Sequence, residues 1–189
     1  MALLIEHRLR ASVFVVIVCL AAAFPIHAQQ KVYDERQVKA TYLFHFTQFV
    51  EWPAAAFSDP RSPFVIGVLG DDPFGSVLND LVKGEAVGDH QLVVQRFRRL
   101  EEIRTCHILF ISSSETRTYA QIFARLQGRS ILTVGETAGF ATSGGGVELL
   151  TERTAIRPRV NVGAAKAAGV TISSRLLKLV DIVGAERTP

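Results

Sequence analysis

Polar residues that could bind a ligand or a partner follow directly after several apolar runs of this sequence. Carboxylates and hydroxyls are groups that move protons, hold metal ions or hydrogen-bond a ligand. The candidate contact residues are Asp71, Asp72, Ser112, Ser113, Glu115, Gly135, Glu136 and Phe140. Glu136 is the strongest single candidate, because the sequence offers no helix cap as a partner for its carboxylate. A buried ion pair with Arg175 is the alternative for Glu136.

These residue types could support catalysis only if a nucleophile, a base and an oxyanion donor came together. The sequence contains no G-x-S-x-G elbow, no H-E-x-x-H helix and no paired-cysteine motif. Beyond residue 28 it has three histidines, His45, His90 and His107, and none of them has a second ligand at metal-binding spacing. The glycine-rich turns lack the spacing of a dinucleotide or P-loop site. We therefore predict a protein that is not an enzyme and that holds no metal or cofactor.

The apolar runs that precede the candidate residues are expected to be strands. Phe64–Leu69, His107–Ile111 and Ser130–Val134 are almost continuous apolar segments without period-2 alternation. Such segments are typical of strands that are buried on both faces of a parallel sheet. Because the carboxyl ends of parallel strands meet at one edge, the candidate residues are expected to lie close together there.

Helical spacing and capping residues alternate with these strands. Asp34 is expected to cap the first helix, Asp72 the second, and Ser112 with Glu115 has the spacing of a capping box. Near the C-terminus, an Ala-rich segment and a Leu-rich segment are expected to form two more helices. The predicted helices are Asp34–Glu51, Pro73–Leu81, Ser112–Gln127, Asn161–Ala168 and Ser173–Val183.

Two pairs of short extended segments complete the prediction. Glu85–Val87 and Gln91–Arg96 form the first pair, and Val147–Leu150 is expected to be antiparallel to Ala155–Val162. Pro158 lies inside the last segment and cannot donate to a ladder, so we expect it at a sheet edge or a bulge. The fold class is α/β, a three-layer sandwich with a mostly parallel central sheet, helices on both faces and an antiparallel edge near the C-terminus.

The first residues have the pattern of a targeting segment. Arg8 and Arg10 precede the apolar run Val13–Ala23, which predicts a signal peptide over residues 1–28 that is cleaved after Ala28. A retained membrane anchor is the alternative, although the apolar run is shorter than the ~20 residues that a span needs. The protein is therefore expected to be exported and periplasmic.

The remaining residues, 29–189, have the length of one domain. Without Glu6, Arg8 and Arg10, this part has 19 basic and 17 acidic residues, and a formal charge of +2 is too balanced to indicate a nucleic-acid partner. Cys106 is the only cysteine of this part, so no disulfide can form within one subunit. A small buried hydrophobic residue is the favoured interpretation of Cys106, and an intermolecular disulfide or a reactive thiol is the alternative.

Taken together, these motifs resemble one family, the YfiR-like periplasmic proteins. No single motif is decisive, but the matching segments cover nearly all of residues 29–189 in order. The segments that carry the resemblance are Val38–Ala40, Phe49–Pro53, Gly70–Gly75, Cys106–Ser112, Ile131–Glu136, Asn161, Ala164–Ala165 and Ile172–Leu179.

The resemblance implies a non-enzymatic α/β protein that binds and represses the periplasmic part of an inner-membrane diguanylate cyclase. Family members release the cyclase under envelope or redox stress. While they repress it, less cyclic di-GMP is made and less biofilm forms. A small-molecule receptor built like half of a solute-binding protein is the alternative. A homodimer and a small-molecule ligand are left open as further partners.

Two departures from the family pattern limit what the resemblance implies. Cys106 matches one family cysteine but lacks its partners, which puts an intrachain redox switch in doubt. Pro158 and Arg159 stand where the family usually continues a strand with an aromatic residue. This second departure concerns a sheet edge or the surface that meets the partner.

Overall fold

Five parallel strands form the centre of the sheet in the computed structural model, which describes residues 34–153 and 155–184. Within these residues eight strands form one sheet in the order β10-β8-β7-β6-β5-β2-β4-β3. The strands are β2 (Phe64–Leu69), β3 (Ala86–Val87), β4 (His90–Phe97), β5 (Ile108–Ile111), β6 (Leu132–Gly135), β7 (Val147–Glu152), β8 (Ala155–Asn161) and β10 (Asp181–Val183). The predicted signal peptide, residues 1–28 with its cleavage after Ala28, lies outside the described residues.

The central strands are buried, as their composition predicts. Every residue of β2, β5 and β6 is buried, and β2 pairs in parallel with both β4 and β5. At the other side of the centre, β7 is parallel to β6 and antiparallel to β8. The register aligns Leu69 with Ile111 and Ile111 with Gly135, so β2, β5 and β6 end side by side.

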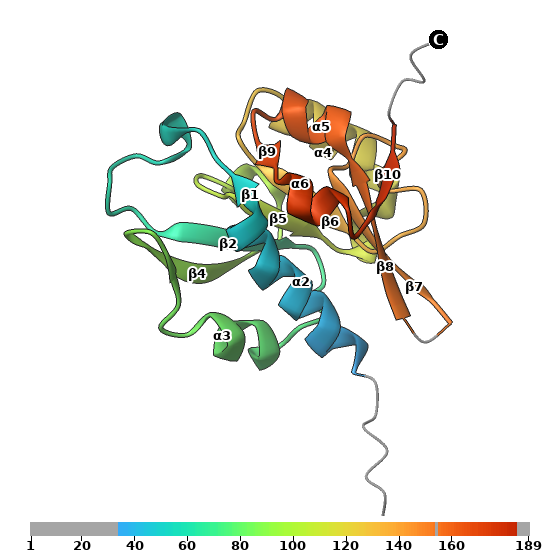
Figure 1. The fold of residues 1–189 in the computed structure, drawn as a ribbon, viewed down its shortest axis with the longest axis horizontal. Helices are drawn as coiled ribbons and strands as arrows, with labels where there is room; N and C mark the ends of the chain where they lie inside the picture. The colour runs from blue at the N-terminus through green and yellow to red at the C-terminus, as the bar shows by residue number, and fades with distance from the viewer. Residues whose placement is uncertain (1–33, 154, 185–189) are drawn as a thin grey trace, which may run out of the picture. The chain divides into compact units, whose positions relative to one another are not determined.

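Helices cover both faces of this sheet, which confirms the three-layer α/β prediction. One apolar core lies under α2, α3, α5 and α6, and a second lies on the opposite face under α4. Figure 1 shows α2 crossing the near face, with α3 beside it. The helices are α2 (Glu35–Phe49), α3 (Ser76–Val82), α4 (Tyr119–Leu126), α5 (Val162–Ala167) and α6 (Ser174–Leu177), with short 3-10 turns η1 (Ala54–Ala56), η2 (Leu100–Glu102) and η3 (Ser113–Thr118).

The first helix begins where the sequence predicts. Asp34 caps α2, and its carboxylate accepts a hydrogen bond from the backbone N–H of Arg36 at 3.0 Å. The helix ends at Phe49, before Pro53, and buries Ala40, Leu43 and Phe46 against the sheet. A capped, amphipathic segment of this length is recognisable from local sequence alone.

The predicted helix Pro73–Leu81 begins later than expected. Asp72 accepts a hydrogen bond from the backbone N–H of Phe74 at 2.8 Å, so it closes a turn ahead of α3 instead of capping it. Gly75 separates the turn from the helix with a φ of +56°, a conformation that glycine adopts without strain.

The predicted helix Ser112–Gln127 is divided into η3 and α4, and the capping box does not form. The backbone N–H of Ser112 donates to the carbonyl of Leu69 at 3.0 Å and so continues the ladder between β5 and β2. The Glu115 carboxylate therefore has no N–H of Ser112 to accept from, and it accepts from the hydroxyls of Ser114 and Thr118 instead.

The predicted helix Ser173–Val183 is wrong in its second half. Ser173 caps α6 as expected, but the helix ends at Leu177, and Asp181–Val183 forms β10 parallel to β8. An unpredicted two-stranded sheet also joins β1 (Val50–Glu51) to β9 (Thr171–Ile172). Both corrections involve backbone partners that are distant in sequence, and these partners override local helical preference.

Both pairs of predicted extended segments form strands, and the predicted antiparallel pairing of the second pair is confirmed. β3 and β4 pair antiparallel, and β7 and β8 pair antiparallel over six residues on each strand. Pro158 lies one residue before the stretch of β8 that pairs with β10, so β8 is a sheet edge at that position. The missing N–H of Pro158 is tolerated at such an edge.

Candidate functional site

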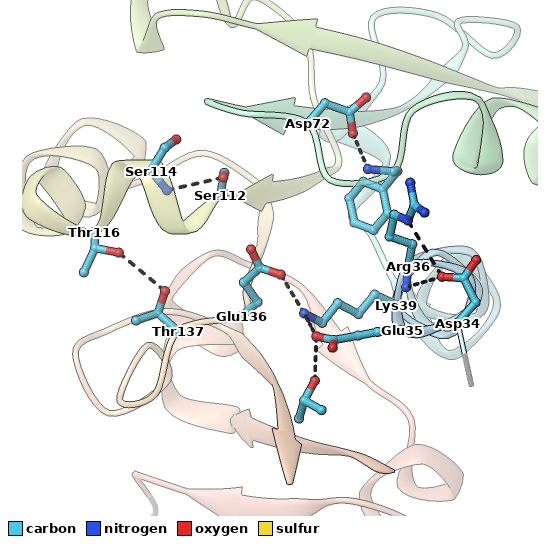
Figure 2. Close-up of polar contacts among 12 residues, drawn as sticks. Asp34, Glu35, Arg36, Lys39, Asp72, Ser112, Ser114, Thr116, Glu136 and Thr137 are labelled. Carbon is cyan, nitrogen blue, oxygen red and sulfur yellow. Dashed lines mark hydrogen bonds and ion pairs between the residues drawn. The ribbon is translucent and has the colours of Figure 1, made fainter. Parts of the chain in front are cut away.

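The turns that follow β2, β5 and β6 lie against one another at the carboxyl-terminal edge of the parallel strands. The hydroxyl of Ser114 accepts a hydrogen bond from the backbone N–H of Asp71 at 3.1 Å. The hydroxyls of Thr116 and Thr137 lie 3.4 Å apart, and Figure 2 shows this contact between the turns after β5 and β6. The prediction that these turns converge is therefore confirmed.

Gly70 allows the first two turns to approach so closely. It has a φ of +86°, and a Cβ at this position would lie 2.4 Å from the Ser114 hydroxyl oxygen. Any other residue would strain the backbone, and its Cβ would displace the Ser114 hydroxyl that joins the two turns. Glycine is thus required here by conformation and by space.

Lys39 brings α2 into this edge and neutralises part of its acidic charge. Its Nζ lies 2.6 Å from Oε2 of Glu136 and 2.5 Å from Oε1 of Glu35. Figure 2 shows Lys39 between the two carboxylates. The Lys39 side chain is 8% exposed, the Glu136 side chain 16% and the Glu35 side chain 45%. The three charges form a cluster in which Lys39 is buried and Glu35 is accessible to solvent.

The electrostatics of this cluster favour the charged forms. Burial opposes the charge on Lys39, but hydrogen bonds to Glu136 and Glu35 raise the pKa of Lys39 above its ordinary value. Hydrogen bonds from Lys39 and from the Thr151 hydroxyl lower the pKa of Glu35. Two carboxylates around one ammonium leave the cluster with one net negative charge at neutral pH.

An open depression of about 450 Å³ lies over the cluster. Its walls combine the three charges with hydroxyls and one apolar side chain. It is lined by Glu35, Lys39, Ser113, Glu136, Thr137, Leu150 and Thr151. Such a mixture suits recognition of a polar or cationic group.

Ser113 and Glu136 are the predicted site residues that line this depression. Asp71 is exposed beside it, and its contact role stays a prediction. Asp72 instead accepts a hydrogen bond from Nε of Arg96 at 2.7 Å, an interaction that holds the turn before α3 to β4. Glu115 is half-buried and accepts from neighbouring hydroxyls, so it supports η3.

Three predicted contact residues are buried and serve the fold. Phe140 is 1% exposed and packs edge-on against Tyr119 with ring centroids 5.0 Å apart. A Cβ on Gly135 would lie 2.4 Å from the Phe140 ring, so this glycine is required by packing. Ser112 is 3% exposed, and its hydroxyl accepts from the backbone N–H of Ser114 at 3.3 Å. Burial disfavours direct contact by Phe140 and Ser112, and the contact role of all three residues stays a prediction.

Sequence reasoning missed Lys39, Glu35 and Thr151. The Thr151 hydroxyl donates to Oε1 of Glu35 at 2.7 Å across 116 positions, which no local pattern signals. Lys39 could have been found, because it lies four residues after Glu35 and four before Leu43 on the buried face of the helix. The alternative partner Arg175 is exposed on α6, and the ion pair of Glu136 is made by Lys39.

Cys106 is buried, as favoured from the sequence. Its thiol donates a hydrogen bond to the carbonyl of Ile108 at 3.0 Å, and burial raises its pKa to about 12. The reactive species of a cysteine is the thiolate. This environment therefore disfavours the reactive-thiol interpretation.

Neither a metal centre nor a membrane span emerges from the part of the chain that the structure describes. Across residues 34–153 and 155–184, no three side chains of His, Cys, Asp or Glu gather closely enough to hold a metal ion. Among the same residues, no helix has both the length and the apolar character that crossing a bilayer requires.

Comparison with known proteins identifies the family to which this chain belongs. No curated protein matches the chain significantly. The model of the YfiR/HmsC-like family matches residues 36–181, which include α2 from its second residue, the strand-end turns and every strand of the sheet up to the first residue of β10. Because this match covers well over half of its length, the chain belongs to the YfiR/HmsC-like family.

Proposed function

We propose that this protein binds the periplasmic part of an inner-membrane diguanylate cyclase and represses it without catalysing a reaction. The YfiR/HmsC-like family is one of periplasmic regulators of diguanylate cyclase signalling, and it supplies the general role. The specific partner, the contact surface and the direction of control are our proposal.

The observation that carries the contact surface is the charged depression at the carboxyl-terminal edge of the strands. Glu136 is partly accessible there although its carboxylate already pairs with a buried lysine. A basic group of a partner can approach through the open Glu35 side and meet the net negative charge without breaking the Lys39 pair. The hydroxyls of Ser113 and Thr151 add hydrogen-bonding groups around it.

The first test replaces Glu136 with Gln, which keeps the shape of the side chain and removes its charge. We expect cyclic di-GMP to rise toward the level of a deletion strain, while circular dichroism shows a folded protein. The matched control is Glu85→Gln, because Glu85 is exposed next to β3, at the far end of the sheet from the site. This control is expected to repress normally.

Pull-down from membranes with both variants completes the test. The wild-type protein and the Glu85→Gln variant should retain a membrane protein with a diguanylate cyclase domain, and the Glu136→Gln variant should retain less of it. Unchanged cyclic di-GMP after deletion, together with no cyclase captured by the wild type, would contradict the proposal. Loss of folding in the Glu136→Gln variant would assign Glu136 to structure.

The size of the depression also favours a second candidate function, a periplasmic small-molecule receptor. Many ligand sites lie at the carboxyl ends of parallel strands, and many have a volume similar to the 450 Å³ of this depression. Thermal-shift screening with cationic periplasmic metabolites tests this role, because a ligand of the folded state raises the melting temperature. Shifts that vanish in the Glu136→Gln variant would support the receptor, and a screen without shifts would count against it.

A further inference from the structure

A second depression, of about 420 Å³, lies at the opposite, amino-terminal edge of the sheet. It opens between the segment that follows η1 and the segments that lead into β5 and β6. It is lined by Ala55, Ala56, Phe57, Ser58, Arg104, Thr105, Cys106, Gly128, Arg129, Ser130 and Ile131. Neither the family assignment nor the proposed repressor role assigns a function to this depression.

Arg129 is held in place at this depression. Its Nη2 donates to the backbone carbonyl of Ile103 at 3.1 Å and to that of Arg104 at 2.9 Å. These two bonds fix the plane of the guanidinium, which has five N–H donors in all. A fixed guanidinium loses little conformational entropy when it binds an anion.

The charge of the depression is not compensated within the described residues. Its lining contains two arginines and no carboxylate. Across residues 34–153 and 155–184, the ion pairs of the structure include neither Arg104 nor Arg129. The neighbouring carboxylate of Asp59 accepts from the Ser58 hydroxyl and from the backbone N–H of Arg61. The depression is therefore a positively charged surface.

The rest of the lining is suited to an uncharged organic body. Phe57, Ala55 and Ala56 supply accessible apolar surface, and Ser58, Thr105 and Ser130 supply hydroxyls. The Phe57 ring is held by stacking on His90 and His107, with ring centroids 3.9 and 4.5 Å away.

We propose that this depression binds a small organic anion, in which a carboxylate or phosphate ester group pairs with Arg104 and Arg129 while a short apolar body lies against Phe57 and Ala55. The two sources of the anion share one chemistry, acceptor oxygens that match a guanidinium. This site is separate from the proposed partner surface and does not depend on it.

Isothermal titration of the full chain with phenyl phosphate, benzoate, inorganic phosphate and benzyl alcohol tests this proposal. We expect saturable binding of phenyl phosphate, benzoate or both, weaker binding of inorganic phosphate, and none of benzyl alcohol. Arg104→Gln should reduce the affinity about tenfold, the loss expected for one charge-assisted hydrogen-bonding group. Arg129→Lys keeps a charge but lacks the fork, and it should also weaken binding.

The matched control is Arg117→Gln, which removes the same charge from an exposed position on η3, at the opposite edge. Its affinity for phenyl phosphate should equal that of the wild type. No saturable binding at millimolar concentrations, or an equal loss in Arg104→Gln and Arg117→Gln, would overturn the proposal. Equal binding of benzyl alcohol would overturn the role of the arginines, and equal binding of inorganic phosphate would overturn that of the apolar wall.

Discussion

At the carboxyl-terminal edge of the parallel strands a charged lysine lies between two carboxylates, whereas at the amino-terminal edge the buried imidazole of His107 is neutral. Nδ1 of His107 accepts from the backbone N–H of Val65 at 3.0 Å, and its Nε2–H donates to the carbonyl of Ala56 at 3.2 Å. Its ring is stacked on Phe57 and Phe64 with centroids 4.5 and 4.7 Å away.

The difference shows two ways in which one sheet accommodates buried polar groups. The carboxyl-terminal edge keeps its charges and pairs them, so each partner needs the other. The amino-terminal edge removes the charge from its histidine, because burial lowers the pKa of His107. The two edges should therefore respond differently to substitution and to pH.

The largest expected effect is that of Lys39→Met. Removing the ammonium leaves the carboxylate of Glu136 largely buried without its partner, and we expect the free energy of unfolding to fall by about 3 kcal/mol. Urea denaturation followed by circular dichroism measures this loss. Lys83→Met, at an exposed lysine after α3, should change stability by less than about 0.5 kcal/mol.

The double variant Lys39→Met/Glu136→Gln sharpens this result. Removing the unpaired charge should restore part of the lost stability, and a double-mutant cycle measures the coupling between the two side chains. A loss below about 1 kcal/mol in Lys39→Met would instead place the pair among ordinary surface ion pairs.

The next effect is that of His107→Leu at the other edge. Leucine leaves the buried N–H of Val65 and the carbonyl of Ala56 without their partner, which should cost about 2 kcal/mol of stability. His45→Leu is the matched control, because His45 is exposed on α2. Equal losses in the two variants by urea denaturation would contradict the structural role of His107.

Acidification should weaken the amino-terminal edge first. The folded-state pKa of His107 lies below its ordinary value of 6.5, so the unfolded chain binds the proton more readily. The contribution of His107 is fully present above about pH 6.5 and is lost as the pH falls toward the folded-state pKa. Urea midpoints between about pH 7 and pH 5 should decrease in the wild type and less in His107→Leu.

The carboxyl-terminal edge should resist this pH range. The pKa of Glu35 is lowered from 4.5, so its contribution is present above that value and is lost only at lower pH. A fall in stability between pH 7 and pH 5 that persists in His107→Leu but is absent in Glu35→Gln would show that the carboxyl-terminal edge weakens first.

The smallest effect is expected for Thr151→Val. It removes one partly buried hydrogen bond to Glu35, which should cost about 1 kcal/mol or less. The pKa of Glu35 should also rise, because the Thr151 hydroxyl is one of the groups that lower it. A carboxyl NMR titration measures the rise, with Thr41→Val as control, because the hydroxyl of the half-buried Thr41 donates to the Gln37 carbonyl and not to Glu35. An unchanged pKa would show that the hydroxyl does not stabilise the carboxylate.

Much of the fold was predictable, because it depends on patterns within one element. β2 has the predicted bounds, and α2 begins after the predicted cap Asp34, since burial periodicity and capping are local properties. The end of the chain was not predictable in this way. Asp181–Val183 continues a helical pattern in sequence, and it forms a strand because β8 offers it an unpaired edge.

The candidate site was predictable in position but only partly in its residues. Strand ends after apolar runs located the correct edge, and Glu136 and Ser113 line its depression. Gly135 at the end of β6 and Phe140 after it were indistinguishable from contact residues, because the sequence does not show that the Phe140 ring folds back onto the core. Their burial is decided by the packing of α4 over that face.

The sequence by itself determined the alternation of buried strands and helices, the polar turns at one edge and the absence of a recognisable catalytic motif, since each depends on neighbours along the chain. Only the tertiary structure decided that Lys39, and not Arg175, pairs with Glu136 across 97 positions. It also brought Arg104 and Arg129 to one depression without a carboxylate in its lining. Charge pairing depends on distance in space, and that distance is set when helices pack onto the sheet.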